Sequence, residues 1–439
     1  MDIEENKNTE EIIFSPRILE LKNGYNFSRF SKDILAGLIV AIIAIPLSIA
    51  LALSSGVGVK EGLFTAIIAG GVISLFGGTK FQIAGPTAAF ATIVANIVTK
   101  EGMNALIIST LFAGLLMVIF GILRLGKFIK YMPEIVTLSF TLAIATSILF
   151  GELKNFFGLT YTETAIESID KIKLFAQYIS TINPYAFALS LVSLLIIVFW
   201  KKLPKISTFI PSTLIAIIIS IIASIIINKT INAGTIKTIG DLYEIPHDLP
   251  TFVFPSFKSF NYLSIIKNGF MIAILASLES LLSAVVADKM GDDKHYSNTE
   301  LIAQGLGNIA SCLFGGIPAT GAIARTASNI KAGSTSPVSG IFASIVIFLV
   351  LLFFGPYTAY IPLPCIAAIL VSVAYNMSGW RNIRDLVKKS KNTKELVANY
   401  ILLIIVFAIT LLFNLIVAIA LGCVIYAIFV KMKFITKKN

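Results

Sequence analysis

Two ionisable residues, Glu279 and Arg325, lie deep inside long apolar segments of this 439-residue chain. A charge at the centre of a bilayer costs about 2.5 to 3.5 kcal/mol on insertion scales, so such residues normally face a cavity or a partner and mark a solute pathway. Between them, residues 314–321 read Phe-Gly-Gly-Ile-Pro-Ala-Thr-Gly, which predicts broken rather than helical backbone. Within hydrocarbon, such backbone is tolerated only where protein or a water-filled cavity satisfies its polar groups. We therefore expect a solute site at this stretch.

An earlier copy of the same pattern indicates an internal repeat. Phe-Gly-Gly occurs at 76–78, before Gln-Ile-Ala-Gly-Pro-Thr at 82–87, and recurs at 314–316, an offset of 238 residues (314 − 76). In each half of the chain the pattern follows the second of seven apolar segments. Because seven is odd, the second half must start from the opposite side of the membrane, which predicts an inverted repeat.

Composition supports this interpretation, since 56% hydrophobic and 13% charged residues are too apolar a mixture for a soluble globule. We predict an all-α polytopic membrane protein with 14 transmembrane segments arranged as a 7+7 inverted repeat. The third and tenth segments should be half-helices preceded by short extended strands. The predicted segments are 33–54, 61–76, 81–99, 103–123, 133–151, 184–200, 207–228, 262–287, 298–314, 318–331, 337–354, 360–376, 396–412 and 414–431.

The distribution of positive charge predicts the topology. Lysine and arginine concentrate in the short loops at 124–130, 201–205 and 381–394 and at the C-terminal end, and the positive-inside rule places these in the cytoplasm. We therefore expect a multi-pass protein of the plasma or inner membrane, with a cytoplasmic N-terminal segment (1–32) and a cytoplasmic tail (433–439). The net charge of +11 then reflects membrane topology, and no nucleic-acid partner is expected. No cleavable signal peptide is visible.

The sequence offers few residues that could catalyse a reaction or bind a metal ion. The three cysteines, Cys312, Cys365 and Cys423, stand singly in apolar segments, and the two histidines, His247 and His295, fall in predicted loops. Neither a metal-ligand spacing nor a nucleophile with a matching base is present in the sequence pattern. We expect no enzyme activity and no cofactor, with H⁺ or Na⁺ as a coupling ion.

The two interrupted segments predict an anion site. If each becomes helix near the midplane, inversion points two helix N-termini at one spot, each carrying free N–H groups and about half a positive charge. Gly85 and Gly321 would allow close approach of backbone, and Pro86 suits a first helical turn. The predicted anion-binding residues are Gly85, Pro86, Thr87, Ala88, Ala89, Ile323, Ala324, Arg325 and Thr326, with Ser48 added from the kink expected at Pro46. For Arg325 a purely structural pairing with Glu279 or with backbone carbonyls stays open. For Ser48 core packing is the alternative.

Glu279 is the predicted cation-coupling group. Ser283 lies one turn further on the same helical face, so the pair could bind a proton or join backbone carbonyls around Na⁺. The alternative is a structural counter-charge to Arg325. The two other acids near segment ends, Asp33 and Asp288, are interpreted as a helix N-cap and a loop-proximal cap.

Several motifs, in order, resemble the SulP (sulfate permease) family of anion transporters. They are Asp-Ile-Leu-Ala-Gly at 33–37, Pro-Leu-Ser-Ile-Ala at 46–50, Gln-Ile-Ala-Gly-Pro-Thr at 82–87, and the residues from Glu279 through Glu300 to Thr326. The resemblance covers about residues 33 to 430. It implies the UraA-like inverted-repeat fold, with a core domain (33–123 and 262–354) that moves like an elevator against a gate domain (131–228 and 356–432).

The resemblance also implies substrates such as sulfate, bicarbonate, chloride or dicarboxylates. In sodium-coupled members the equivalents of Glu279, Ser283, Gly321 and Ile323 surround the cation, whereas in proton-coupled members the acid carries the proton. Glu rather than Asp at position 279 favours H⁺. Many members have Gln where this chain has Leu47, and members usually continue into a cytoplasmic STAS domain, whereas this sequence stops at Asn439.

Two alternative functions stay open. A nucleobase–cation symporter shares the expected architecture, although a cationic half-helix start at Arg325 favours an anion. An uncoupled anion channel would use the same site without a coupling ion. The sequence does not decide whether the protein forms a homodimer.

Overall fold

Apolar segments determine the fold, because a helix satisfies its own backbone groups and can therefore cross hydrocarbon. In the computed structural model, nine helices among the described residues are long and apolar enough to span a membrane. The structure describes residues 12–22, 24–127, 132–161, 163, 165, 167–200, 202, 210–231, 234–243, 249–256, 261–388, 393–412, 415–432 and 434. His247, most of the predicted tail and part of the basic loops, including Lys201 and Lys205, lie outside these residues.

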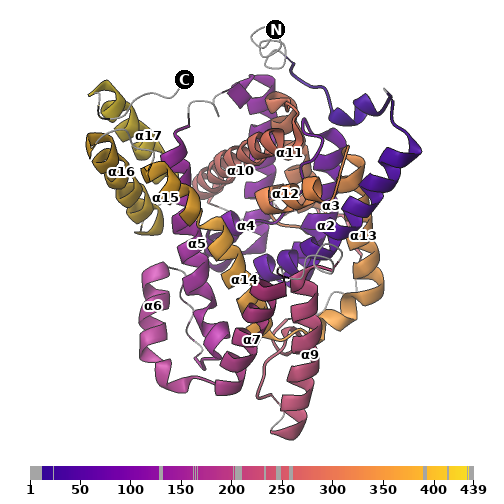
Figure 1. The fold of residues 1–439 in the computed structure, drawn as a ribbon, viewed down its shortest axis with the longest axis vertical. Coiled ribbons are helices and arrows are strands. Elements are labelled where there is room, and N and C mark those ends of the chain that lie inside the picture. The colour runs from indigo at the N-terminus through magenta and orange to yellow at the C-terminus, as the bar shows by residue number, and fades with distance from the viewer. Residues whose placement is uncertain are drawn as a thin grey trace.

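The first half of the chain follows the predicted order (Figure 1). Its elements are η1 (Arg17–Lys22), α2 (Phe27–Ser54), α3 (Val59–Phe76), β1 (Ala84–Gly85), α4 (Ala88–Ile122), α5 (Glu134–Phe157), α6 (Ser168–Gln177), η3 (Ile179–Thr181), α7 (Pro184–Trp200), α9 (Ser212–Thr230) and η4 (Ile239–Asp241). Within α4, Gly102 has φ 85° and ψ 171°, so two helices meet there. This break separates the predicted half-helix at 81–99 from the next segment, as expected.

The second half repeats this arrangement. Its elements are α10 (Tyr262–Gly291), α11 (Ser297–Leu313), β2 (Thr320–Gly321), α12 (Ile323–Lys331), α13 (Val338–Phe354), η5 (Gly355–Tyr360), α14 (Leu363–Met377), α15 (Trp380–Lys388), α16 (Thr393–Leu412) and α17 (Leu415–Lys431). Helix α12 has nine residues and follows a two-residue strand, which matches the predicted half-helix.

One short sheet joins the two halves. Strands β1 and β2 pair antiparallel, with Ala84 opposite Gly321 and Gly85 opposite Thr320. All four residues are buried. The pairing satisfies backbone groups that neither half could satisfy alone, and it places the starts of α4 and α12 next to each other.

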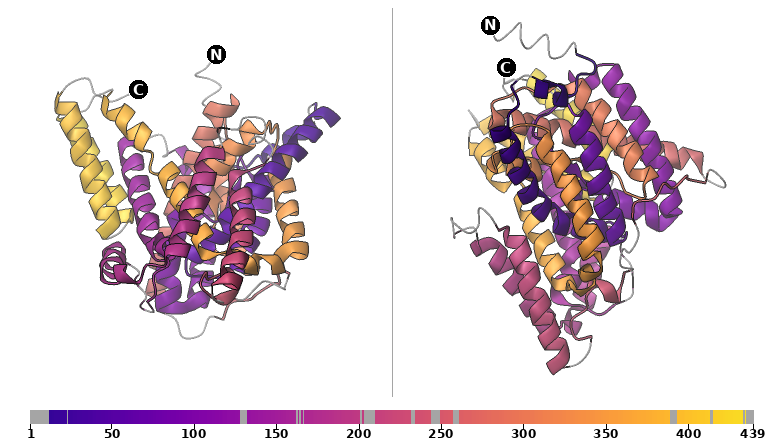
Figure 2. Two further views of the ribbon diagram at one scale, coloured as in Figure 1. Left: turned by 60° about the horizontal axis from the view of Figure 1, so that its bottom comes forward. Right: turned by 90° about the vertical axis from the view of Figure 1, so that its right-hand side faces the viewer.

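The helices pack in two groups. In the first, α4 packs against α10 and α11, α2 against α13, and α3 against α11 and α13. In the second, α5 packs against α14 and α16, and α7 against α9 and α14. Figure 2 shows α16 and α17 at one edge of the molecule and α2 with α13 at the other. Contacts of α2 with α14 and of α4 with α5 join the groups.

Small residues allow the closest of these contacts. A Cβ added to Gly305 of α11 would lie 2.5 Å from the backbone oxygen of Gly114 in α4, and one added to Gly114 would lie 2.8 Å from the oxygen of Gly305. Close approach through small residues is a common source of packing energy between membrane helices, where lipid is as apolar as the side chains.

The prediction that Asp33 caps its own helix is wrong. Asn26 is the N-cap of α2, accepting from the Arg29 backbone N–H at 3.0 Å, so Asp33 lies inside the helix. Its buried carboxylate accepts from the backbone N–H groups of Thr335 (2.5 Å) and Ser336 (3.1 Å), which precede α13. Helix α2 begins at Phe27, in the polar stretch before the predicted apolar segment that starts at residue 33. Hydropathy marks the start of the apolar segment but not the start of the helix.

Asp33→Ala should lower stability, because it leaves two backbone N–H groups and the hydroxyls of Tyr25, Thr335 and Ser336 without their acceptor. Loss of a buried acceptor costs on the order of 1–3 kcal/mol. We expect a lower midpoint of thermal unfolding in detergent, followed by intrinsic fluorescence. The exposed neighbour variant Lys32→Ala is the matched control, and equal midpoints for the two variants would contradict this role.

Candidate functional site

The first half-helix begins at Ala88, two residues after Pro86. Thr87 is the N-cap of α4, with φ −127° and ψ 157°, and the helix starts at Ala88. Pro86 therefore precedes the cap, and its prediction as part of the first helical turn is wrong. Pairing of β1 with β2 holds the chain extended through Gly85, so the turn into the helix can start only after that residue.

The second half-helix places Arg325 in its first turn, as predicted. Ala322 is the N-cap of α12 and Arg325 is its third residue. In neither α4 nor α12 does the side chain of the cap residue accept a hydrogen bond from the helix. The first N–H groups of the two helices therefore lack a side-chain cap, and their partial positive charge remains available to a ligand.

Arg325 binds the backbone of the opposite half. Its side chain is 2% exposed, and Nη2 donates to the carbonyl oxygen of Pro86 at 2.9 Å. Nη1 is buried without a hydrogen-bond partner within the described part of the chain. A Cβ added to Gly85 would lie 2.4 Å from Nη1. Arg325 therefore makes one of the structural pairings left open by the sequence, a hydrogen bond to a backbone carbonyl. That hydrogen bond uses Nη2 and leaves Nη1 without a partner among the described residues.

Glu279 contacts the first half-helix. Its carboxylate, 8% exposed, accepts from the Thr87 hydroxyl at 2.9 Å. Arg325 holds the carbonyl of Pro86, so the two opposite charges contact adjacent residues of one turn. The described ion pairs do not include Glu279 with Arg325. If Glu279 acts as a counter-charge to Arg325, it does so through the turn at Pro86 and Thr87 and not by direct contact.

The other predicted cation-coupling residues lie around the second half-helix. Ser283 is fully buried and its hydroxyl lies 3.3 Å from the Thr326 hydroxyl, which also accepts from the backbone N–H of Ile83. Gly321 packs against the Gln82 amide, and Ile323 is 42% exposed. A search of the described residues finds no group of three or more His, Cys, Asp or Glu side chains that could hold a metal ion.

Ser48 and the alanines of α4 differ in their surroundings. Ala88 and Ala89 are buried in the first turn of α4. Ser48 is fully buried in α2, and its carbonyl oxygen lies against Gly62 of α3. No described hydrogen bond joins Ser48 to Arg325 or Glu279. Its backbone contact with Gly62 instead belongs to the packing of α2 against α3.

A buried acid that the site prediction missed organises the approach to β1. Glu300 of α11 is fully buried and accepts from the Gly78 backbone N–H (3.0 Å), the Thr79 hydroxyl (3.2 Å) and the Gln82 amide (2.7 Å). The Ser280 hydroxyl (3.1 Å) and Gln304 amide (2.9 Å) complete the set. Glu279 and Arg325 are therefore not the only deeply buried charges, and the polar residues around Glu300 in apolar segments were the available signal.

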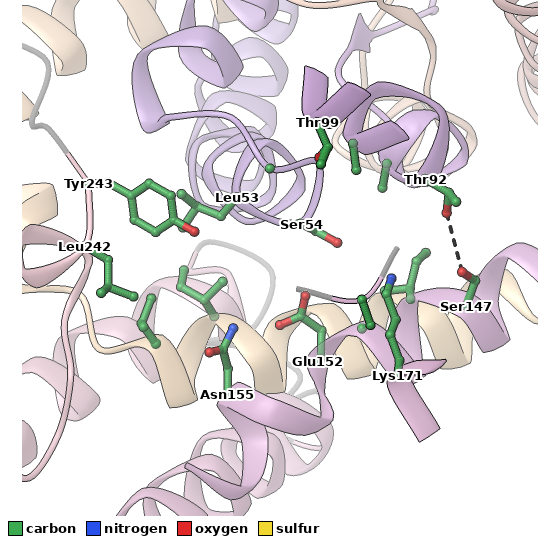
Figure 3. A pocket seen from close by; sticks show the side chains of 18 residues that line it. Leu53, Ser54, Thr92, Thr99, Ser147, Glu152, Asn155, Lys171, Leu242 and Tyr243 are labelled. Carbon is green, nitrogen blue, oxygen red and sulfur yellow. Dashed lines mark hydrogen bonds between the residues drawn. The ribbon is translucent and has the colours of Figure 1, made fainter. Parts of the chain in front are cut away.

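A cavity of about 250 Å³ lies beside α4, between the two helix groups (Figure 3). Thr92 and Thr99 of α4, Glu152 of α5 and Lys171 of α6 line it. None of the predicted site residues is part of its lining, although Ala91 and Thr92 lie on the next turn of α4 after Ala88 and Ala89.

Paired half-helix starts with a buried arginine, inside a bundle of apolar helices long enough to span a membrane, are typical of secondary transporters. The model of the sulfate permease family matches residues 30–398, and the chain belongs to this family of anion transporters.

The chain is 42% identical over 408 residues to the putative sulfate transporter YvdB of Bacillus subtilis, covering 92% of this chain and 74% of that one. It is 30% identical to the bicarbonate transporter BicA of Picosynechococcus sp., covering 92% and 70%.

Solved structures support the same fold. The transmembrane domain of a cyanobacterium bicarbonate transporter BicA superposes with a TM-score of 0.76 at 27% identity, covering 92% of this chain and 99% of that one. SLC26A9 superposes with a TM-score of 0.81 at 20% identity, covering 100% and 71%, a likeness of fold alone. The 7+7 inverted-repeat architecture predicted from the sequence is thereby confirmed.

Gly85→Ala should reduce anion uptake at least tenfold without unfolding the protein. The new Cβ would meet Nη1 of Arg325 and displace the guanidinium, which ends a flexible side chain. Because Gly85 has φ 156°, where a side chain strains the backbone, we also expect a somewhat lower unfolding midpoint. Uptake into proteoliposomes and the thermal unfolding midpoint are the measurements. Gly71→Ala is the control, since its Cβ would meet only Ser344 at 3.6 Å. Unchanged uptake in Gly85→Ala would show that the position of the guanidinium is unimportant.

Proposed function

We propose that the chain carries a small inorganic or organic anion, such as sulfate, bicarbonate or a dicarboxylate, across the cell membrane by secondary active transport coupled to H⁺ or Na⁺. The observation that carries this proposal is the buried Nη1 of Arg325, left without a partner beside the paired starts of α4 and α12. The relatives named above, a putative sulfate transporter and a bicarbonate transporter, support an anionic substrate of this size.

The substrate would bind at the starts of the two half-helices. The proposed site runs from Gly85 to Ala89 and from Ile323 to Thr326. Within it, the first residues of α4 and α12 supply backbone N–H groups without a side-chain cap and the positive ends of two helix dipoles. Arg325 adds a full positive charge and a free donor, and a charge-assisted hydrogen bond is roughly twice as strong as a neutral one. Together these groups favour a compact anion over a neutral nucleobase, the substrate of the rival symporter class.

Glu279 would couple a cation to this site. Its carboxylate accepts from Thr87, the cap of the half-helix that faces the anion. While Glu279 is ionised, its negative charge opposes an anion bound nearby, and this repulsion disappears when the carboxylate takes up a proton. This arrangement supports proton–anion symport. Na⁺ bound among Glu279, Ser283, Gly321 and Ile323 is the second candidate and would cancel the same charge.

Transport would proceed by movement of one helix group against the other. The group of α2, α3, α4 and α10 to α13 carries both half-helices and corresponds to the proposed core domain (33–123 and 262–354). The group around α5, α7 and α14 corresponds to the proposed gate domain (131–228 and 356–432). An elevator motion would carry the intact site past the gate. Cytoplasmic termini, a homodimer and a plasma-membrane location are part of this proposal, and an uncoupled channel is its alternative.

Removing the arginine tests the anion site. Arg325→Ala should lower uptake of sulfate, bicarbonate or fumarate into proteoliposomes by about 10- to 100-fold, the effect of losing one charged hydrogen bond. Arg384→Ala, which removes an exposed arginine of α15, is the control. Wild-type protein that transports none of these anions, with or without a pH or Na⁺ gradient, would refute the proposal, as would tight binding of uracil or xanthine.

Neutralising the acid tests the coupling. Glu279→Gln should uncouple uptake from an imposed pH gradient, because the amide can neither bind nor release the proton. Internal anion would then not accumulate above the external concentration, although exchange of labelled for unlabelled anion should continue. Glu134→Gln, an exposed position at the start of α5, is the matched control. Accumulation by Glu279→Gln driven by the pH gradient would contradict proton coupling at this residue.

A further inference from the structure

The cavity beside α4 brings together two unlike charged groups. Helices α5 and α6 lie side by side in the lower half of the view in Figure 1, and residues of both line the cavity. Glu152 is 4% exposed and projects into the cavity, and its Oε2 has no hydrogen-bond partner within the described chain. Ser54 and Asn155 lie next to this carboxyl group.

Lys171 faces the same cavity from α6 (Figure 3). Its Nζ would lie 3.5 Å from a Cβ placed on Gly151, the residue before Glu152. The described ion pairs within 4 Å do not include Lys171 with Glu152, although the two charges interact over a longer distance. A half-buried ammonium and a buried carboxyl group with one unpartnered oxygen thus face one cavity large enough for a small ion.

The rest of the lining is suited to a small polar ligand. Hydroxyls of Thr92 and Ser147 lie 3.4 Å apart and join α4 to α5 across the cavity. Thr99, Asn155 and Tyr243 add further groups that can donate hydrogen bonds. Such a ring of donors suits a ligand made mostly of acceptor oxygens.

We propose that this cavity is an entry site for a small oxyanion such as sulfate, held by the ammonium of Lys171 and the surrounding donors once Glu152 has taken up a proton. The proposal rests on the anion transport proposed above and adds a second site to it. Thr92 lies about one turn of α4, roughly 5.4 Å along the helix, beyond the predicted central site at Ala88. An anion held here is therefore close to the half-helix starts.

Protonation decides whether the cavity attracts an anion. With Glu152 ionised, its charge cancels that of Lys171, whereas a protonated Glu152 leaves one positive charge and a further O–H donor. Among the described lining residues, the other titratable group is Tyr243, after η4; α2, α4 and α14 contribute none. On α5 itself, Lys154 instead donates to the carbonyl of Tyr161 at 2.6 Å.

Two cavity groups outside the membrane-spanning helices have shifted pKa values. Burial lowers the pKa of Lys171, but the nearby Glu152 opposes this shift, so the ammonium and the carboxyl are electrostatically linked. Burial raises the pKa of Tyr243, so its hydroxyl stays protonated and can donate. Anion binding in the cavity should therefore strengthen as the pH falls.

Lysine footprinting tests occupancy directly on the wild-type protein in proteoliposomes. We expect sulfate to slow acetylation of Lys171 by an amine-reactive reagent at least threefold, relative to gluconate at equal ionic strength, with stronger protection at pH 6.5 than at pH 8. Lys173 on the same helix, 71% exposed and paired with Asp170, is the internal control and should show no protection. Equal acetylation of Lys171 in sulfate and gluconate would overturn the proposal.

Transport kinetics test the same site through variants. Lys171→Gln should raise the KM for sulfate about tenfold with little change in maximal rate, and Glu152→Gln should lower the KM at pH 8 and remove its pH dependence. Lys173→Gln and Glu134→Gln are the controls. If Arg325→Ala abolishes uptake while Lys171→Gln leaves the KM unchanged, the entry site fails and anion transport stands. If sulfate protects Lys171 in a protein that transports nothing, transport fails and the cavity site stands.

Discussion

The antiparallel pairing of Ala84–Gly85 with Thr320–Gly321 is the constraint on which the rest of the structure depends. Two chain segments that are extended inside a membrane bundle must satisfy their backbone groups with protein, and here each half satisfies the other. The pairing forces α4 and α12 to begin side by side, which concentrates two positive helix ends in one place. Glu300 stabilises the chain that leads into β1, because its carboxylate accepts hydrogen bonds from the Gly78 backbone N–H and the Gln82 amide. Without the strand pairing, the backbone groups before each half-helix would be buried without hydrogen-bond partners, which is unfavourable.

The two charges beside this pairing are stabilised through backbone and hydroxyl groups of the same turn. Arg325 donates to the carbonyl of Pro86, and Glu279 accepts from the hydroxyl of Thr87. A direct buried ion pair would satisfy both charges fully and would leave little to offer a ligand. The indirect arrangement separates them and leaves Nη1 of Arg325 unpartnered. In the proposed transport cycle the site binds and then releases an anion, and a donor left without a protein partner is suited to that.

Sequence reasoning recovered the features that follow from backbone chemistry. The Gly-Gly and Gly-Pro interruptions predicted two half-helices, and the odd number of segments predicted their inversion; the structure has the half-helices and the structural neighbours confirm the inverted repeat. It failed where long-range contacts decide. Asp33 stands where an N-cap would stand, yet it serves Thr335 and Ser336, some 300 residues away. Pro86 could not enter the first turn, because a strand partner from the other half holds Gly85 extended. No local pattern encodes either partner.

Glu152 shows the same limit. It directly follows the predicted segment 133–151, and only the fold places it in a cavity with Lys171 of α6. The cavity lies between a helix of the half-helix group and α5 of the other group, so any relative movement of the groups must change it. An anion bridging Thr92 and Lys171 would contact both groups at once, and protonation of Glu152 would decide when that bridge forms. Two acids on opposite groups, Glu279 and Glu152, could then make entry and movement of the anion depend on protons at separate steps.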